Sequence, residues 1–147
     1  MRIVRFVVQP LFVLGRLYWF LARPKTYGVK CIIEHEGKYL FIRNNYGRGR
    51  WTFPGGGVKR EEKAEDAARR EVREEVGIEL SEVRHLGSFE HESEYKRDTM
   101  DVFHARVSSK AFNRNSWEIA EVQWFSKDNP PEPLSPLVGV IKNKFVI

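Results

Sequence analysis

Three glutamates lie on one face of a predicted helix. Glu71, Glu74 and Glu75 are related by the spacings i, i+3 and i+4, and because each helical residue advances by about 100°, their side chains share one narrow sector. Like charges at this spacing repel each other, so a positive partner is needed to hold them together. A hard divalent cation with oxygen ligands meets that need, which predicts a Mg²⁺ or Mn²⁺ site here.

Small residues frame the same helix. Gly56 precedes it, and Gly77 is typical of a residue that ends a helix. Ala64, Ala67 and Ala68 lie in the same sector ahead of the glutamates, where their short side chains would let the helix lie close against a sheet. One face of this helix is therefore expected both to pack and to bind a cation.

The whole segment 56–78 resembles the signature of the Nudix hydrolases, Gly-x5-Glu-x7-Arg-Glu-U-x-Glu-Glu-x-Gly-U, in which U is a bulky apolar residue. The specified positions are all matched, at Gly56, Glu62, Arg70, Glu71, Val72, Glu74, Glu75, Gly77 and Ile78. A solvated helix rich in Glu and Arg is the alternative interpretation. That alternative explains the charge, but it explains neither the flanking glycines nor the spacing.

The resemblance implies a metal-dependent hydrolase that cleaves a phosphoanhydride bond. Its substrate would be a nucleoside diphosphate linked to another group, such as a nucleoside triphosphate or a dinucleoside polyphosphate. Glu71 and Glu75 are the implied metal ligands, Glu74 completes or extends the cluster, and the main-chain oxygen of Gly56 adds a further ligand. A non-catalytic Nudix-fold module that binds a nucleotide is an alternative, although such a module would be expected to have lost signature glutamates.

Two further roles follow from the same resemblance. Arg70 would pair with Glu62 and fix the geometry between loop and helix, which makes both residues part of the predicted catalytic set with Glu71 and Glu74. The general base stays open, because family members place it on the signature helix or on a separate loop. Glu71 is the candidate within the motif, and the candidates outside it are Glu90, Glu92, Glu94, Glu118 and Glu121.

Substrate contacts are predicted close to the motif. Arg43 and Arg50 could hold terminal phosphates. Trp51 and Phe53 could flank a base, with core positions in a half-buried strand as the competing interpretation. Tyr95 resembles the downstream tyrosine associated with dinucleoside polyphosphate hydrolases. The pattern alone does not select one substrate.

The elements that must position these residues alternate between short strands and two helices. Strands are predicted at 29–35, 38–43, 51–53, 82–90, 100–107 and 122–125, and helices at 61–76 and 137–144. Glu36 and Gly37 form the turn of a first hairpin. This order with one central helix predicts an α/β class protein, an α/β/α sandwich with a mixed β-sheet, over a domain at 25–147.

Residues 1–24 form a separate apolar and basic extension with a predicted helix. Pro10, Gly15 and Arg16 interrupt its apolar run, so we do not expect it to span a membrane. Packing on the domain or forming a homodimer through this helix is the preferred interpretation. Peripheral contact with a membrane surface, with the protein anchored there, is the alternative.

Composition is consistent with one small enzyme domain. The 147 residues carry a net charge of +5, and the first 50 of them hold ten Lys or Arg against two Glu. This asymmetry predicts an anionic partner, either the phosphates of a small-molecule nucleotide or an acidic membrane surface, and a nucleic acid is not expected. Cys31 is the single cysteine, so no intramolecular disulfide forms, which is compatible with a cytoplasmic location.

Overall fold

The structure is a computed structural model that describes residues 25–46, 48–93, 96–145 and 147. The extension at 1–24, with its predicted helix and its dimer or membrane contact, lies outside the described residues, as do Glu94 and Tyr95. Within the part of the chain that the structure describes, no helix is long and apolar enough to cross a membrane.

The described elements follow the predicted order. They are β1 (Lys25–His35), β2 (Lys38–Asn44), β3 (Trp51–Thr52), α2 (Ala64–Val76), β4 (Arg84–Ser93), β5 (Lys96–Arg106), β6 (Ile119–Ser126) and α3 (Pro136–Phe145). The predicted hairpin turn is present, with positive φ at Glu36 (46°) and Gly37 (75°), which is the backbone twist that a two-residue hairpin turn favours.

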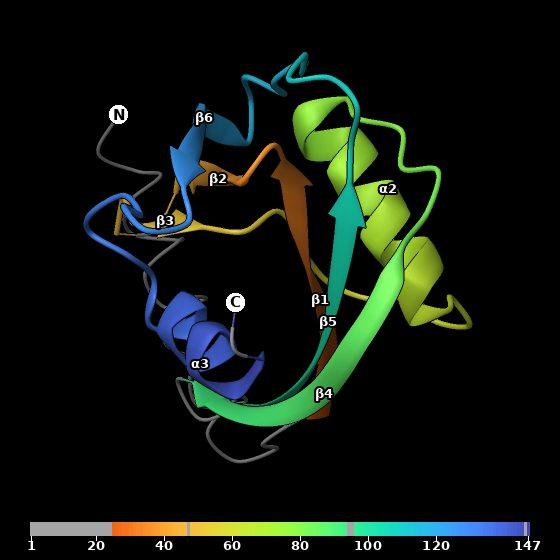
Figure 1. The fold of residues 1–147 in the computed structure, drawn as a ribbon. Coiled ribbons are helices and arrows are strands. Elements are labelled where there is room, and N and C mark those ends of the chain that lie inside the picture. Colours follow the sequence, from red (N-terminus) through yellow and green to blue (C-terminus); the bar gives the residue numbers. More distant parts are fainter. Residues whose placement is uncertain (1–24, 47, 94–95, 146) are drawn as a thin grey trace, which may run out of the picture.

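The strands form one mixed sheet in the order β3-β2-β1-β5-β4, and β6 pairs with β2. β1 and β5 run parallel, while the other pairs are antiparallel. α2 and α3 lie on opposite sides of the β1–β5 pair (Figure 1). The predicted sandwich with a mixed sheet is therefore confirmed.

A separate apolar cluster fills each side of the sheet. Val72 and Ala68 of α2 pack with Cys31 and Ile33 of β1 in one cluster. Val138 and Ile141 of α3 lie in the other cluster, with the aromatic side chains of β2 and β3. The small residues of α2 that the sequence assigned to packing are buried, since Ala67 and Ala68 have no exposed surface.

β1 and β2 separate soon after their turn, and the glycine segment takes the place of β2 beside β1. The two strands pair only at Glu34 with Tyr39 and at His35 with Lys38. Farther along β1, Val29 N donates to Gly56 O at 2.9 Å and Cys31 N donates to Pro54 O at 2.8 Å. The turn before α2 is thereby fixed against the central strand.

α2 begins at Ala64, three residues later than predicted from the sequence. Glu61 has a positive φ of 64°, and Glu62 N donates to Lys59 O at 3.1 Å in a turn, so these residues cannot continue the helix. The helix ends as predicted, because Gly77 adopts φ 67° and its N–H donates to Arg73 O at 3.0 Å. Glu62 is thus left on a loop that folds back towards α2.

Candidate functional site

Arg70 stands at the centre of a carboxylate network on α2. Its Nε and Nη2 donate to the two carboxylate oxygens of Glu62 at 2.7 and 3.0 Å. Its Nη1 donates to Glu71 Oε1 at 2.7 Å and to Glu74 Oε2 at 3.2 Å. The hydrogen bond from Arg70 is the main reason why the pKa of Glu62 falls to about 2. The structure therefore places the predicted Glu62–Arg70 pair in bidentate contact, which fixes its geometry.

Arg70 also anchors the glycine turn. Its Nη2 donates to Gly57 O at 2.9 Å, so the same guanidinium holds the turn, the loop glutamate and the helix together. Only 13% of its side chain is exposed. The main role of Arg70 is to position the other residues of the site.

Glu71 lies directly against the backbone of the turn. A Cβ added at Gly56 would lie 2.6 Å from the carboxylate carbon of Glu71, and one added at Gly55 would lie 2.1 Å from Val29 O. Gly55 also has a φ of 145°, which side-chain-bearing residues rarely adopt. Gly56 is therefore required for the Glu71 carboxylate to approach the turn, and Gly55 is required for the turn to lie against β1.

Glu75 is the buried carboxylate of the site. Its exposed fraction is 4%, and its Oε2 accepts a hydrogen bond from Gly55 N at 2.8 Å. Burial raises the pKa of Glu75 to about 7, with the charges of Glu71 and Glu118 acting in the same direction, while Lys30 and the Gly55 hydrogen bond oppose the rise. The carboxylate gains charge near neutral pH, where a cation would stabilise it most.

Lys30 is a site residue that the sequence reading missed. It projects from β1, and its Nζ donates to Phe53 O at 2.9 Å and lies 3.5 Å from Gly55 O. Burial lowers the pKa of this ammonium, and the charges of Glu75 and Glu71 oppose that effect. The signal in the sequence is a lone lysine inside the apolar strand run from Val29 to Ile33.

The structure divides the three helix glutamates between different contacts. Glu74 is half-exposed and faces Arg70, whereas Glu75 faces Gly55. Among the residues that the structure describes, no group of three His, Cys, Asp or Glu side chains converges well enough to hold a metal ion. Arg70 Nη1 donates to both Glu71 and Glu74, and of these three glutamates Glu71 and Glu75 are the two with contacts to the glycine turn.

The main-chain oxygen expected to act as a ligand is engaged within the sheet. Gly56 O accepts the hydrogen bond from Val29 N, and Gly55 O lies 3.5 Å from Lys30 Nζ. The assignment of individual metal ligands at Glu71, Glu74, Glu75 and Gly56 stays a prediction. Two carboxylates beside a carbonyl oxygen nevertheless form a set of hard donors that fits a divalent cation.

A loop between β5 and β6 brings a further carboxylate to the site. Asn113 N donates to Val76 O at 2.8 Å and Asn115 N donates to Glu75 O at 2.9 Å, so this loop is tied to the end of α2. Glu118 follows it, and its main-chain oxygen accepts from Asn45 N at 2.8 Å. The negative charge of Glu118 contributes to the raised pKa of Glu75.

The other candidate bases are placed differently. Glu121 forms a close ion pair with Arg43. Glu90 is exposed on β4, the edge strand two positions from β1, and Glu92 lies 3.5 Å from Arg97 in an ion pair. Of the described candidates outside the motif, Glu118 is thus the one whose contacts link it to the α2 carboxylates.

The residues predicted to contact the substrate occupy different environments. Phe53 is fully buried and stacks on Phe41 with ring centroids 4.7 Å apart. Trp51 is 6% exposed and packs edge-on against Phe125. These positions match the core interpretation rather than contact with a base. Arg43 is occupied by its ion pair, and Arg50 remains half-buried at the end of the loop before β3.

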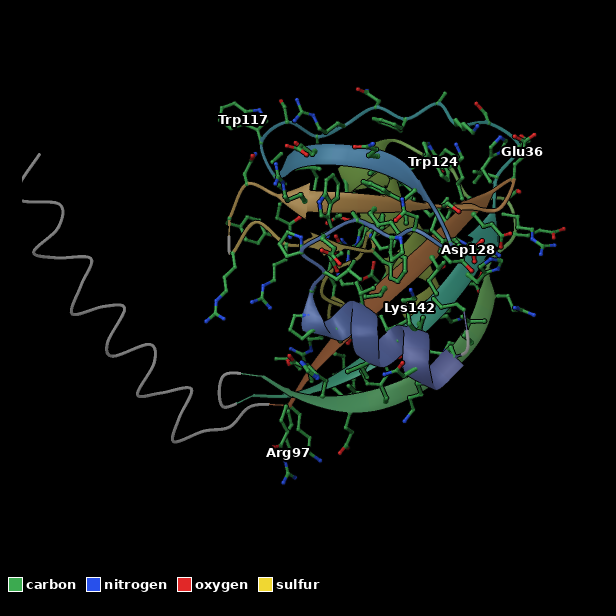
Figure 2. All side chains as sticks on the ribbon, turned by 60° about the vertical axis from the view of Figure 1, so that its left-hand side comes forward. Glu36, Arg97, Trp117, Trp124, Asp128 and Lys142 are labelled. Carbon is green, nitrogen blue, oxygen red and sulfur yellow. The ribbon has the colours of Figure 1, made fainter. Side chains whose placement is uncertain are left out.

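Two exposed aromatic rings lie on the loops after β2 and before β6, and the sequence reading did not select them. Tyr46 is 67% exposed and Trp117 is 91% exposed. Asn45 links their loops, because its Nδ2 donates to Ser116 O at 2.8 Å and to Trp117 O at 2.9 Å. Burial raises the pKa of Tyr46, and the charge of Glu75 adds to this, which places the phenol near the site. Figure 2 shows Trp117 on the loop before β6, pointing away from the sheet.

Comparison with known proteins identifies related sequences. A family model described as a NUDIX domain matches residues 23–141. The chain is similar to the low-salt glycan biosynthesis protein Agl8 of Haloferax volcanii, with 37% identity over 101 residues, covering 67% of this chain and 61% of that protein. It is also similar to an RNA pyrophosphohydrolase of Serratia proteamaculans, with 42% identity over 74 residues, covering 50% of this chain and 41% of that protein. The chain therefore spans less than two thirds of the length of these curated relatives.

Solved structures share the fold over most of the chain. The MutT NUDIX hydrolase from Burkholderia pseudomallei superposes with a TM-score of 0.76 at 25% identity, covering 82% of this chain and 98% of that chain. The MutT protein from Methanosarcina mazei Go1 gives a TM-score of 0.73 at 26% identity, covering 84% and 94%.

Proposed function

The chain belongs to the Nudix family, and we propose that it is a metal-dependent hydrolase acting on a nucleoside diphosphate linked to another group. The observation that carries this proposal is the placement of two carboxylates against one glycine turn. Glu71 touches Gly56 and Glu75 is bound by Gly55 N, so both carboxylates lie against neighbouring residues of one turn. Carboxylates held in this way suit binding a cation that neutralises a diphosphate.

Mg²⁺ is the proposed metal, with Mn²⁺ as a substitute. Glu71 and Glu75 would hold it together with a main-chain oxygen of the glycine turn, because hard oxygen donors are what these ions prefer. When bound, such an ion offsets phosphate charge and lowers the pKa of a coordinated water. Binding favours the charged carboxylate of Glu75, so metal affinity should increase as pH rises towards 7.

The protein's own residues have distinct proposed roles. Arg70 and Glu62 hold the turn and Glu71 in place. We assign the general base to Glu118, because its loop is tied to Glu75 and its charge acts on that carboxylate. Glu71 is less suited to this task, since its Oε1 already accepts a hydrogen bond from Arg70 at 2.7 Å.

The nucleoside part of the substrate is proposed to stack on Tyr46 and Trp117. Both rings are exposed, and the hydrogen bonds of Asn45 keep their loops together beside the carboxylates. Stacking of a base on an aromatic ring contributes about 1–3 kcal/mol and tolerates different bases. The rings would thus supply binding energy without dictating one nucleotide. Replacing Trp117 by Ala should raise KM and leave kcat nearly unchanged.

A turnover screen tests the proposal. The full chain would be incubated with Mg²⁺ and with nucleoside triphosphates, nucleotide sugars, ADP-ribose, dinucleoside polyphosphates or triphosphate-ended RNA, and released phosphate and mononucleotide would be measured. We expect turnover of at least one of these substrates. Tight nucleotide binding without turnover of any substrate would instead support a non-catalytic module.

Two variants separate the proposed roles. Glu71→Gln should lose both metal affinity and turnover. Glu118→Gln should retain metal affinity while kcat falls about 100-fold or more and its pH profile loses the acidic limb, as expected for loss of a general base. A Glu118→Gln enzyme with the same kcat and pH profile as the wild type would refute the assignment of the base.

A further inference from the structure

Lys30 places its ammonium group at the glycine turn that the two carboxylates contact. The residue lies in the middle of β1 between the buried side chains of Val29 and Cys31. Its ammonium is held by Phe53 O at 2.9 Å, with Gly55 O at 3.5 Å. Gly55 is also the residue whose N–H binds Glu75. One residue of the turn therefore separates this ammonium from the buried carboxylate.

Lys30 and Arg70 both act on these carboxylates, but in different ways. Arg70 donates hydrogen bonds to Glu62, Glu71, Glu74 and Gly57. Lys30 donates its hydrogen bonds to main-chain oxygens, yet its charge acts on both Glu75 and Glu71. Its contribution to these carboxylates is thus through space. A lysine ammonium has three donors, so a phosphate oxygen entering the site could be bound as well.

This arrangement has opposite consequences for a metal ion and for a diphosphate. A divalent cation that approaches Glu71 and Glu75 is repelled by the ammonium that already compensates them, and partial burial strengthens such repulsion. A diphosphate brings negative charge, which attracts both Lys30 and the metal. Substrate and metal should therefore favour each other's binding.

We propose that Lys30 makes metal binding depend on substrate: its charge weakens the binding of a divalent metal to the free protein, and a bound diphosphate removes this penalty. The second half of the statement rests on the proposed function, whereas the first half concerns the free protein alone. Lys30 is in this view a positioning and charge-setting residue.

Direct metal binding tests the first half. Mn²⁺ binding to the full chain would be measured by electron paramagnetic resonance or calorimetry at pH 8, without substrate. Lys30→Met should tighten Mn²⁺ binding roughly ten-fold, because a like charge close to the site is removed. Lys30→Arg should bind Mn²⁺ like the wild type. Lys127→Met is the matched control, since Lys127 pairs with Glu34, and it should leave Mn²⁺ affinity unchanged.

Lys30→Gln is a second neutral variant, included in case Lys30→Met does not fold. It removes the charge while retaining a donor for Phe53 O, and it should also tighten Mn²⁺ binding. If either neutral variant that folds binds Mn²⁺ with unchanged or weaker affinity, Lys30 only anchors the turn and the proposal is overturned. Should neither variant fold, the same measurement on wild-type protein decides, because its affinity for Mn²⁺ must rise when a methylene-bridged nucleoside triphosphate is added.

The second half is tested with the same analogue. The gain in Mn²⁺ affinity that the analogue produces should be several-fold smaller in Lys30→Met than in the wild type. An equal gain in both proteins would overturn the coupling. These results are distinguishable from failure of the proposed function: a wild type that hydrolyses nothing refutes hydrolysis, while the order of metal affinities among the variants still decides the role of Lys30.

Discussion

Two charged networks in this protein have opposite compositions. On α2, one cation stands among three carboxylates, with Arg70 bonded to Glu62, Glu71 and Glu74. Near the end of β1 the pattern is inverted, because one carboxylate stands among three basic side chains. Glu34 lies 2.7 Å from His104, 3.1 Å from Lys127 and 3.7 Å from Arg106. The central side chain is mostly buried in both networks, with 13% exposed for Arg70 and 11% for Glu34.

The difference between the networks lies in what remains unbalanced. Burial would raise the pKa of Glu34, but the hydrogen bonds from His104 and Lys127 more than offset it, so its pKa is lowered. Beside the Arg70 network, Glu75 is left with a pKa raised to about 7. The charge of Glu34 is therefore compensated within its own network, whereas burial leaves Glu75 with a carboxylate whose charged form an added cation would favour. A buried carboxylate that is incompletely compensated, more than the number of ion pairs, distinguishes the candidate active site.

The largest expected effect is a difference in kcat between variants at the two networks. Glu75→Gln should lower kcat by about a thousand-fold on any substrate that the wild type turns over, because the loss of a proposed metal ligand would remove several kcal/mol of transition-state stabilisation. Glu34→Gln should remain within about two-fold of wild-type kcat, since its network lies at the other end of β1. Steady-state kinetics with saturating Mg²⁺ measure both. Comparable losses in the two variants would remove the functional distinction between the networks.

The second effect concerns stability. Arg70→Ala should lower the free energy of unfolding by about 3 kcal/mol, because it leaves three carboxylates without their partially buried partner. Arg70→Lys should recover only part of this loss, since an ammonium cannot reproduce the two-pronged contact with Glu62. Urea denaturation at pH 8 gives both values. An Arg70→Ala protein as stable as the wild type would show that the network is merely a surface feature.

The third effect is a difference in the sign of pH dependence. The folded pKa of Glu75 lies above the ordinary value of 4.5, so the unfolded chain loses this proton first as pH rises. Without metal, wild-type protein should therefore lose about 3 kcal/mol of stability relative to Glu75→Gln between pH 4.5 and 7, and no more above pH 7.

Glu34 should show the opposite slope. Its pKa is lowered in the folded state, so its contribution to stability is present above pH 4.5 and is lost as pH falls below that value. The free energy of unfolding of the wild type should therefore increase relative to that of Glu34→Gln as pH rises from the acid range. Unfolding free energies of the three proteins at pH 3.5, 5 and 8 provide the measurement, and parallel pH profiles of the two variants would contradict the comparison.

Local sequence signals predicted the frame of the site well. The order of strands and helices, the Glu36-Gly37 turn and the end of α2 at Gly77 all follow from short-range backbone preferences, and the structure has them. The start of α2 was predicted too early, because the helical charge pattern extends back to Glu61 while the backbone turns there. Periodicity detects side-chain type more readily than a change of backbone direction.

What sequence could not supply are contacts between segments far apart in the chain. Lys30 belongs to the site only because β2 separates from β1 and the glycine turn replaces it. Glu118 belongs to it only because Asn115 binds the main chain of Glu75. Trp51 and Trp117 are both aromatic residues near loops, yet one is buried and the other exposed. Such differences depend on tertiary packing, which no local pattern records.

The smallest expected effect is stabilisation by metal. Adding 10 mM Mg²⁺ at pH 8 should raise the melting temperature of the wild type by about 3 °C, because a ligand that binds only the folded state stabilises it in proportion to the logarithm of its saturation. Glu34→Gln should show the same shift, and Glu71→Gln should show almost none. Differential scanning fluorimetry with Mg²⁺ and, as a matched control for ionic strength, NaCl distinguishes binding from screening. If Mg²⁺ and NaCl shifted all three proteins equally, the carboxylates on α2 would be an unspecific anionic surface, and the contrast with Glu34 would lose its functional meaning.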